Sequence, residues 1–283
     1  MAEEPFLRRG DMPPASPVVL SVPHAGRAYP LALRAALRVP LSAIALLEDR
    51  FIDVVADGAR GACSMLVQTC PRAWIDLNRG EDERDPRVDE GAAVRAPAQQ
   101  SVKLRSGLGL VPRRAAGATE VWRHRFSGAE IDHRIDTVHR PYHAALATML
   151  AAARARFGVA VLLDVHSMPP LSARCGAARI VIGDRFGQSA GERFVACIES
   201  ATHGVRTVRN SPYAGGHILD RHGAPAADIH AVQLEFDRSL YLDVTLTQPG
   251  PGMTSTAALL RRMIDAAEDE ALSAVDPIAY AAE

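Results

Sequence analysis

The sequence is poor in several features that mark particular classes of protein. It has one lysine, Lys103, so nearly all of its positive charges are arginines, and its formal net charge at pH 7 is -1. No basic field is therefore available to draw in nucleic acid or an anionic membrane surface. The four cysteines (Cys63, Cys70, Cys175 and Cys197) include no Cys-x-x-Cys pair, which indicates reduced, buried thiols instead of a zinc knuckle or a disulfide framework. We expect a small-molecule ligand. If it carries carboxylates, the guanidinium groups of arginines can bind them through paired hydrogen bonds.

Long apolar runs are also missing. No run approaches the roughly 20 residues that a membrane span requires, and residues 1–5 are acidic, without the apolar segment of a signal peptide. We therefore predict a soluble, cytoplasmic protein with no membrane partner; the sequence does not indicate its oligomeric state. The hydrophobic content of 48% supports a sizeable core. We predict a flexible N-terminal arm over residues 1–16, a single domain over 17–272 and a C-terminal tail over 273–283.

Three predicted strands end in residues that can do chemistry. The stretch Val159–Met168 begins with a continuous apolar run that contains β-branched residues, which is typical of a buried central strand, and this run ends in Asp164-Val165-His166-Ser167. A strand over 17–22 leads to His24, and a strand over 231–236 carries Glu235 near its end. Catalytic and ligand-binding groups of open α/β sheets gather at such carboxyl ends.

Helices are predicted between these strands. Apolar residues recur at helical spacing over residues 41–60, with Ser42 as a possible N-cap, and this helix would carry Asp49 and Asp53 on one side. A second helix, over residues 131–157, should be kinked or split at Pro141, which lacks a backbone donor. The alternation of strands and helices predicts an α/β fold.

The segment between the first helix and the second carries further polar groups. Two short strands, over 65–68 and 73–77, lead to Asn78 and Arg79, which can both donate to one carboxylate. Residues 80–128 are charged and lack periodicity, so we predict a long excursion with a hairpin near residues 107–111.

The residues at the strand ends suggest a hydrolytic metal site. Two imidazoles, His24 and His166, and one carboxylate suit zinc with an open position for water, and Glu235 suits a general base. For each histidine alone, a hydrogen-bonded place in the core is the competing interpretation, and no His-Glu-x-x-His signature occurs. A serine hydrolase built on Ser167 is disfavoured, because no Gly-x-Ser-x-Gly elbow occurs and neighbouring strand residues point to opposite sides.

A set of motifs in order along the chain resembles the N-formylglutamate amidohydrolase family. Each motif alone is loose, whereas the ordered set covers residues 17–243 and is specific. The motifs are Ser21–Gly26, Glu48–Asp53, Pro71–Arg72, Asp76–Arg79, Pro141–His143, Asp164–Met168, Asn210–Gly216 and Gln233–Tyr241.

The resemblance implies a fold and a set of roles. The fold would be a zinc-carboxypeptidase-like α/β/α sandwich around a mixed, mostly parallel sheet, forming one catalytic domain. His24 and His166 would bind zinc or another divalent metal. Related enzymes have a ligand Glu three residues after the first histidine, where this chain has Arg27, so a third ligand must come from elsewhere. We favour Asp49 over Glu48 and Asp53.

The same resemblance implies a reaction, the hydrolysis of N-formyl-L-glutamate to formate and glutamate in histidine degradation. Glu235 would be the general base, and Arg72 would polarise the scissile carbonyl and stabilise the oxyanion. Two alternatives stay open: a metallo-amidohydrolase for another N-acyl amino acid or short peptide, and a non-catalytic carboxylate-binding relative. The predicted substrate contacts are Asn78 and Arg79 for one carboxylate, and Arg134, Tyr142, Asn210 and Arg238 for the other.

Overall fold

The structure is a computed structural model that describes residues 5–94, 96–115, 120–172 and 177–273. These residues form two compact units. The first unit comprises Met1–Leu7, Pro23–Arg50 and Val67–Ala144, and the second comprises Arg8–Val22, Phe51–Leu66 and Ala145–Glu283. The predicted arrangement of arm, single domain and tail stays a prediction, although Phe6 within the predicted arm is buried and begins a strand.

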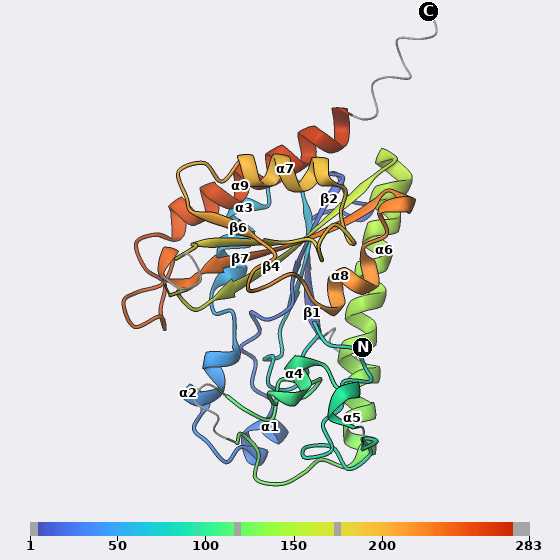
Figure 1. Cartoon of the computed structure of the whole chain (residues 1–283), viewed down its shortest axis with the longest axis vertical. Coiled ribbons are helices and arrows are strands. Elements are labelled where there is room, and N and C mark those ends of the chain that lie inside the picture. Colours follow the sequence, from blue (N-terminus) through green and yellow to red (C-terminus); the bar gives the residue numbers. More distant parts are fainter. Residues whose placement is uncertain (1–4, 95, 116–119, 173–176, 274–283) are drawn as a thin grey trace, which may run out of the picture. The chain divides into compact units, whose positions relative to one another are not determined.

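A seven-stranded mixed sheet organises the second unit (Figure 1). The predicted central strand is β4, the fourth of seven, and all of its residues are buried. It pairs in parallel with β2 and β7, whereas β5 runs antiparallel to β7. The strands, in sheet order, are β1 (Phe6–Arg9), β3 (Ser64–Gln68), β2 (Val18–Val22), β4 (Ala160–Met168), β7 (Ile229–Asp237), β5 (Ile180–Gly183) and β6 (Thr207–Arg209).

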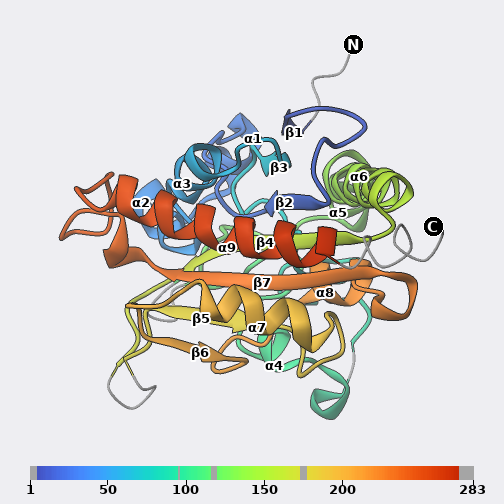
Figure 2. The same cartoon turned by 90° about the horizontal axis from the view of Figure 1, so that it is seen from above.

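Helices of the second unit cover both faces of this sheet, which confirms the predicted layered α/β fold. On one face α9 (Met253–Ser273) packs between α3 (Ile52–Ala59) and α7 (Glu192–Ser200), and on the other α8 (His217–His222) packs on β7 (Figures 1 and 2). No helix in the described part of the chain is long and apolar enough to span a membrane.

The first unit is poor in regular structure, as predicted for residues 80–128. A buried ion pair between Arg113 Nε and Asp85 Oδ2, at 2.9 Å, ties this excursion together. The hairpin predicted near residues 107–111 is wrong, because no strand forms in this described stretch. The helical segments of the first unit are α1 (Leu31–Ala36), α2 (Leu41–Ile44), η1 (Ala45–Leu47), η2 (Pro97–Gln99), α4 (Val102–Arg105), α5 (Gly128–Arg134), the π-helix Ile135–His139 and the beginning of α6 (Arg140–Phe157).

The single helix predicted over residues 41–60 is wrong. The chain leaves the helix at Glu48, whose backbone is extended, and re-enters it after Phe51, whose φ of 61° is left-handed. Ser42 is not an N-cap, because Pro40 occupies that position. A left-handed residue interrupts the i to i-4 hydrogen bonds of a helix, so Asp49 lies in the connecting loop and Asp53 lies in α3.

The strand predicted over residues 73–77 is also wrong. Trp74 N donates to Pro71 O at 2.8 Å, so this stretch is a turn. The Asp76 side chain accepts a hydrogen bond from the backbone N–H of Asn78 at 2.9 Å. Such a local side-chain bond to the backbone competes with strand pairing and favours a turn.

The helical segment around Pro141 is split as predicted, because a π-helix separates two α-helices just before this residue. The π-helix Ile135–His139 connects α5 to α6, and Pro141 is the second residue of α6. Proline cannot donate to the preceding turn and its ring crowds that turn, and a wider turn accommodates both effects.

The described cysteines are free thiols, as predicted: Cys63 is buried, and Cys70 and Cys197 are half-buried. Burial raises the pKa of the Cys63 thiol to about 12, so this thiol stays protonated at neutral pH. Cys175 lies outside the described residues.

Replacing Gly26 is expected to be strongly destabilising. A Cβ at this position would lie 2.0 Å from Cys70 O and 2.6 Å from Thr69 O, and both are backbone atoms. We expect Gly26→Ala to lower the free energy of unfolding by about 3 kcal/mol, in urea denaturation, because overpacking against backbone relaxes poorly. Gly58→Ala in α3 is the control: its Cβ would make an ordinary 3.5 Å contact, and alanine should stabilise the helix by about 0.5–1 kcal/mol. Equal effects of the two substitutions would contradict this prediction.

Candidate functional site

In the first unit, His24 and Asp49 form a close pair. Asp49 N donates to His24 O at 2.9 Å, so the backbone holds the two loops together. Their side chains are 2% and 3% exposed, and His24 Nδ1 lies 3.5 Å from Asp49 Oδ2. Zinc bonds of about 2.0–2.2 Å in tetrahedral geometry place neighbouring ligand atoms about 3.3–3.6 Å apart. The spacing of this pair therefore fits two ligands of one metal ion.

Asp76 orients the His24 ring from its other side. Asp76 Oδ1 lies 2.7 Å from His24 Nε2. Complete burial acts to raise the pKa of Asp76, but the nearby Arg72 and His24 outweigh burial and hold this pKa well below its usual value. Asp76 is therefore an ionised acceptor, and the ring donates its Nε2–H to it. A histidine held in this tautomer presents its Nδ1 lone pair to a cation, as metal-ligating histidines do.

Glu48 is engaged differently from its neighbour Asp49. It accepts a hydrogen bond from Tyr29 Oη at 2.6 Å and from Arg50 at 3.0 Å. Burial raises the pKa of Tyr29 to about 12, and the hydrogen bond and charge of Glu48 add to this effect. Within the first unit, Asp49 is thus the carboxylate on the Nδ1 side of His24, and Glu48 bonds to Tyr29 and Arg50 instead.

The structure gathers three predicted site residues around Asp76. Arg72 Nε lies 2.8 Å and Arg79 Nε 3.9 Å from Asp76 Oδ2, and Asn78 N donates to Oδ1 of the same carboxylate. Arg79 Nε also donates to Leu108 O at 2.9 Å. One buried carboxylate thus orients a predicted metal ligand, the predicted carbonyl-polarising arginine and the predicted substrate grip.

Arg134 and Tyr142 lie in the packing of the first unit. The Arg134 guanidinium sits 3.5 Å from the centre of the Trp74 ring and 4.0 Å from that of Phe126, and it donates to Trp74 O at 3.1 Å. Burial lowers the pKa of Arg134 to about 10. Tyr142 is fully buried and packs edge-to-face on Phe6. Both residues support the structure, and their contact with substrate stays a prediction.

In the second unit, Asp164 orients His166. Asp164 Oδ2 lies 2.7 Å from His166 Nε2, which is the orienting role that their shared side of the strand suggests. Ser21 Oγ donates to the other oxygen, Asp164 Oδ1, at 2.7 Å. A ring that donates its Nε2–H to Asp164 presents its Nδ1 lone pair, as in His24. In both predicted imidazole ligands, a carboxylate bonded to Nε2 therefore leaves Nδ1 as the metal-binding atom.

Glu235 lies beside His166 in the sheet. The two residues are paired in the parallel register of β4 and β7, so their side chains leave the same face. Gln233 Nε2 donates to Glu235 Oε1 at 3.0 Å, and Glu235 is 8% exposed. Arg238, just after β7, donates through Nε to Ser167 Oγ at 3.2 Å. The second unit thus places His166 and Glu235 side by side, and Arg238 follows directly after the end of β7.

Asn210 is placed differently from these residues. Its Oδ1 accepts the Asp184 N–H at 3.0 Å, and its Nδ2 donates to Asp184 Oδ1 at 2.6 Å. Both ends of the amide thus secure the loop after β5, and a contact of Asn210 with substrate stays a prediction.

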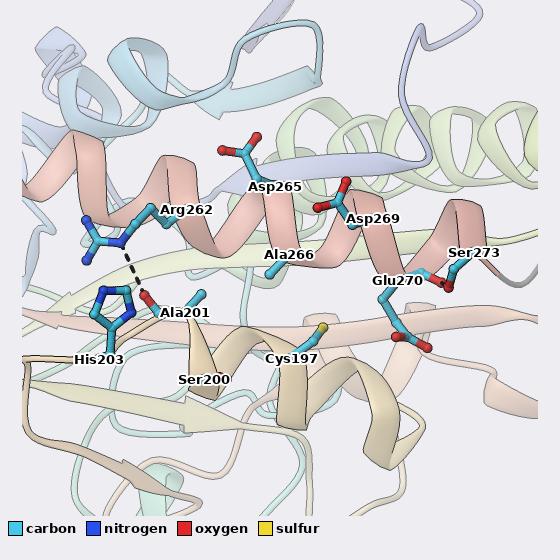
Figure 3. Close-up of a pocket in the computed structure, with 10 residues that line it drawn as sticks. All are labelled: Cys197, Ser200, Ala201, His203, Arg262, Asp265, Ala266, Asp269, Glu270 and Ser273. Atoms are coloured by element: carbon cyan, nitrogen blue, oxygen red, sulfur yellow. Dashed lines mark hydrogen bonds between the residues drawn. The ribbon is translucent and has the colours of Figure 1, made fainter.

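A shallow cavity of about 670 Å³ lies between α7 and α9 (Figure 3). It is lined by none of the predicted site residues. Its charged side chains include Arg262, which donates to Ala201 O at 3.4 Å, with Asp265 and Asp269 on the same helix. We assign it no part in the candidate site.

Comparisons with known proteins identify the family. Residues 16–242 match the family model described as N-formylglutamate amidohydrolase. The chain belongs to the N-formylglutamate amidohydrolase family. It is 30% identical over 239 residues to an N-formylglutamate deformylase of Pseudomonas putida, a match that covers 81% of this chain and 83% of that protein. A second N-formylglutamate deformylase, from Pseudomonas aeruginosa, is 27% identical and is matched over 80% of this chain and 82% of that protein.

A solved structure of the same family is similar along nearly the whole chain. The crystal structure of N-formylglutamate amidohydrolase from Ralstonia eutropha JMP134 has a TM-score of 0.82 and 30% sequence identity, covering 95% of this chain and 98% of that one. The α/β architecture and the enzyme class predicted from the sequence are those of this amidohydrolase family.

Two residues beside the candidate site residues have no role predicted from the sequence. The strand predicted over residues 73–77 includes Asp76, although a carboxylate two residues before Asn78 is a signal for an Asx turn. Gln233 lies two residues before Glu235, and the period of two along a strand already puts both on one face.

Proposed function

We propose that this chain hydrolyses the formyl amide of N-formyl-L-glutamate to formate and glutamate, as the names of its relatives describe for those proteins. The observation that carries the proposal is membership of the amidohydrolase family across residues 16–242. The predicted small-molecule substrate with two carboxylates agrees with the arginine-rich composition of the chain. A role in histidine degradation and a cytoplasmic location belong to the same proposal.

The proposed cofactor is zinc, held by His24, Asp49 and His166. Two imidazoles and one carboxylate are a common catalytic zinc set, although other divalent metals accept the same donors. In support, each histidine has Nε2 bonded to a buried carboxylate, at 2.7 Å in both cases, and Asp49 Oδ2 is 3.5 Å from His24 Nδ1. A bound zinc ion would polarise the formyl oxygen and lower the pKa of a water to about 7.

Glu235 and Arg72 carry out the remaining steps in this proposal. Glu235 takes the proton from the attacking water and returns it to the leaving nitrogen. Gln233 supports this role because its amide holds one Glu235 oxygen at 3.0 Å and so orients the other. Arg72, held by Asp76 at 2.8 Å, stabilises the developing oxyanion.

The substrate carboxylates are assigned to arginines. Asn78 and Arg79 bind one of them. Arg79 Nε donates to Leu108 O at 2.9 Å and Arg79 Nη1 donates to Asn78 O, and these bonds hold the guanidinium in place. Arg238 is assigned to the other, because it directly follows the carboxyl end of β7, the strand that carries Glu235. Arg134, Tyr142 and Asn210 remain weaker candidates, since their side chains already hold other parts of the fold.

The acyl group is tested by comparing substrates. We expect kcat/KM for N-formyl-L-glutamate to exceed that for N-acetyl- and N-succinyl-L-glutamate by at least about 100-fold, because added acyl bulk must clash with a pocket shaped for formyl. Release of free glutamate measures all three reactions in one assay. Preference for a longer acyl group would favour the alternative, a related deacylase. Absence of both stoichiometric metal and zinc-dependent activity would favour a non-catalytic relative.

A further inference from the structure

Two fully buried histidines of the first unit, His139 and His143, have no role in the reaction described so far. His139 ends the π-helix and His143 lies in the first turn of α6. Both rings are 0% exposed, and their centres are 4.4 Å apart. Burying polar rings costs free energy unless they are hydrogen-bonded, so the partners of these rings indicate why histidine is present.

Both rings bond to the same short segment of backbone. His143 Nε2 lies 3.0 Å from Leu77 O, and His139 Nε2 lies 2.9 Å from Arg79 O. A carbonyl oxygen only accepts, so both rings donate through Nε2–H. The two carbonyls stand on either side of Asn78, and the π-turn before Pro141 presents both rings to them.

These bonds complete a frame around the proposed carboxylate grip. Asp76 takes the Asn78 N–H, at 2.9 Å, and Leu108 O takes the Arg79 Nε–H, also at 2.9 Å. The two histidines hold the carbonyls of Leu77 and Arg79 in one orientation through their hydrogen bonds. An apolar side chain of similar size would fill the same space without fixing these peptide groups.

We propose that His139 and His143 are positioning residues that hold Asn78 and Arg79 in the geometry that binds one substrate carboxylate. The inference rests on the proposed function. Misplacing a binding group by about 1 Å can cost about 100-fold in rate, so the effect should be large even though neither ring touches substrate.

The first test replaces each histidine either by a residue that keeps an N–H donor or by one that has none. Glutamine places an amide N–H near the position of Nε2, whereas leucine keeps bulk and removes the donor. We expect His139→Leu and His143→Leu to lower kcat/KM for N-formyl-L-glutamate by about 10–100-fold, chiefly through KM. His139→Gln and His143→Gln should recover to within about 5-fold of the parent enzyme, because the lost bond is restored. Failure of both glutamine variants to recover would overturn the proposal.

The second test asks whether the loss concerns one carboxylate. N-formylglutamine lacks the side-chain carboxylate, and N-formylglutamic acid α-amide lacks the other. With one of these two amides, the leucine variants should match the parent enzyme to within about 3-fold, because the carboxylate that the frame serves is already missing. Equal losses with both amides and with N-formyl-L-glutamate would overturn the positioning role.

Two controls separate this result from other failures. His230→Leu removes a buried imidazole of the second unit that stacks on Phe194 and accepts from Gly191 N at 3.1 Å; it should change the melting temperature without changing the amide pattern. If the leucine variants do not fold, His139→Asn and His143→Asn take their place, because the shorter amide does not reach the carbonyl. A parent enzyme that fails to hydrolyse N-formyl-L-glutamate contradicts the proposed function itself, before any variant is compared.

Discussion

Glu235→Gln is expected to lower kcat for N-formyl-L-glutamate by about 10²–10⁴-fold, the usual contribution of a general base. Glutamine keeps the shape of the side chain but cannot accept the proton of the attacking water. The surroundings favour this choice of base: Glu235 is 8% exposed, is paired in register with His166 and receives a hydrogen bond from Gln233. Formate release under saturating substrate measures kcat directly.

Metal content distinguishes the loss of the general base in Glu235→Gln from the loss of a metal ligand. The Glu235→Gln enzyme should keep the metal stoichiometry of the parent enzyme, because Glu235 is not among the proposed ligands. Glu199→Gln is a matched control: Glu199 lies on α7, where it pairs with Arg209 at 2.7 Å, and its substitution should leave kcat unchanged. A Glu235→Gln enzyme that retains more than about a tenth of the parent kcat would exclude Glu235 as the base.

The sheet was predictable because burial on both faces leaves a simple pattern. The first half of β4, Ala160–Leu163, is apolar at every position, which is typical of a central strand buried on both faces of a largely parallel sheet. The connecting loops were less predictable. The helical spacing of apolar residues continues across Glu48 and Asp49, but the left-handed backbone of Phe51 interrupts the helix. A single left-handed residue does not change the apolar pattern, so the pattern cannot predict it.

The positions of His24, His166 and Glu235 at or near strand ends were predictable from the sequence. Asp76 was missed because its importance comes from contacts at a distance in sequence. It bonds to His24, 52 residues earlier, and no spacing rule predicts that. His139 and His143 show the same difficulty, since the carbonyls that they hold lie about 60 residues away along the chain. Polar networks of this kind depend on the tertiary fold, whereas apolar patterns depend on the secondary structure.

Asp49→Asn is expected to abolish metal retention. Asparagine fits the same space, but its neutral amide is a poor ligand for zinc, and the loss of a direct ligand should exceed the roughly 10–100-fold effect of changing a residue that only orients a ligand. We therefore expect the metal affinity to fall by more than about 100-fold. Metal content per chain, measured after dialysis against a weak chelator, should fall from about one to near zero, and activity should fall with it.

Glu48→Gln and Asp53→Asn are the matched controls, since both carboxylates are neighbours of Asp49 in sequence. Glu48 is held by Tyr29 and Arg50, so its substitution should lower the melting temperature but leave the metal in place. Asp53 lies in the first turn of α3, in the second unit, and its substitution should affect neither property. Because the three variants each remove one negative charge, a general electrostatic effect would weaken metal binding in all of them. Loss of metal in Glu48→Gln or Asp53→Asn with retention in Asp49→Asn would reassign the third ligand.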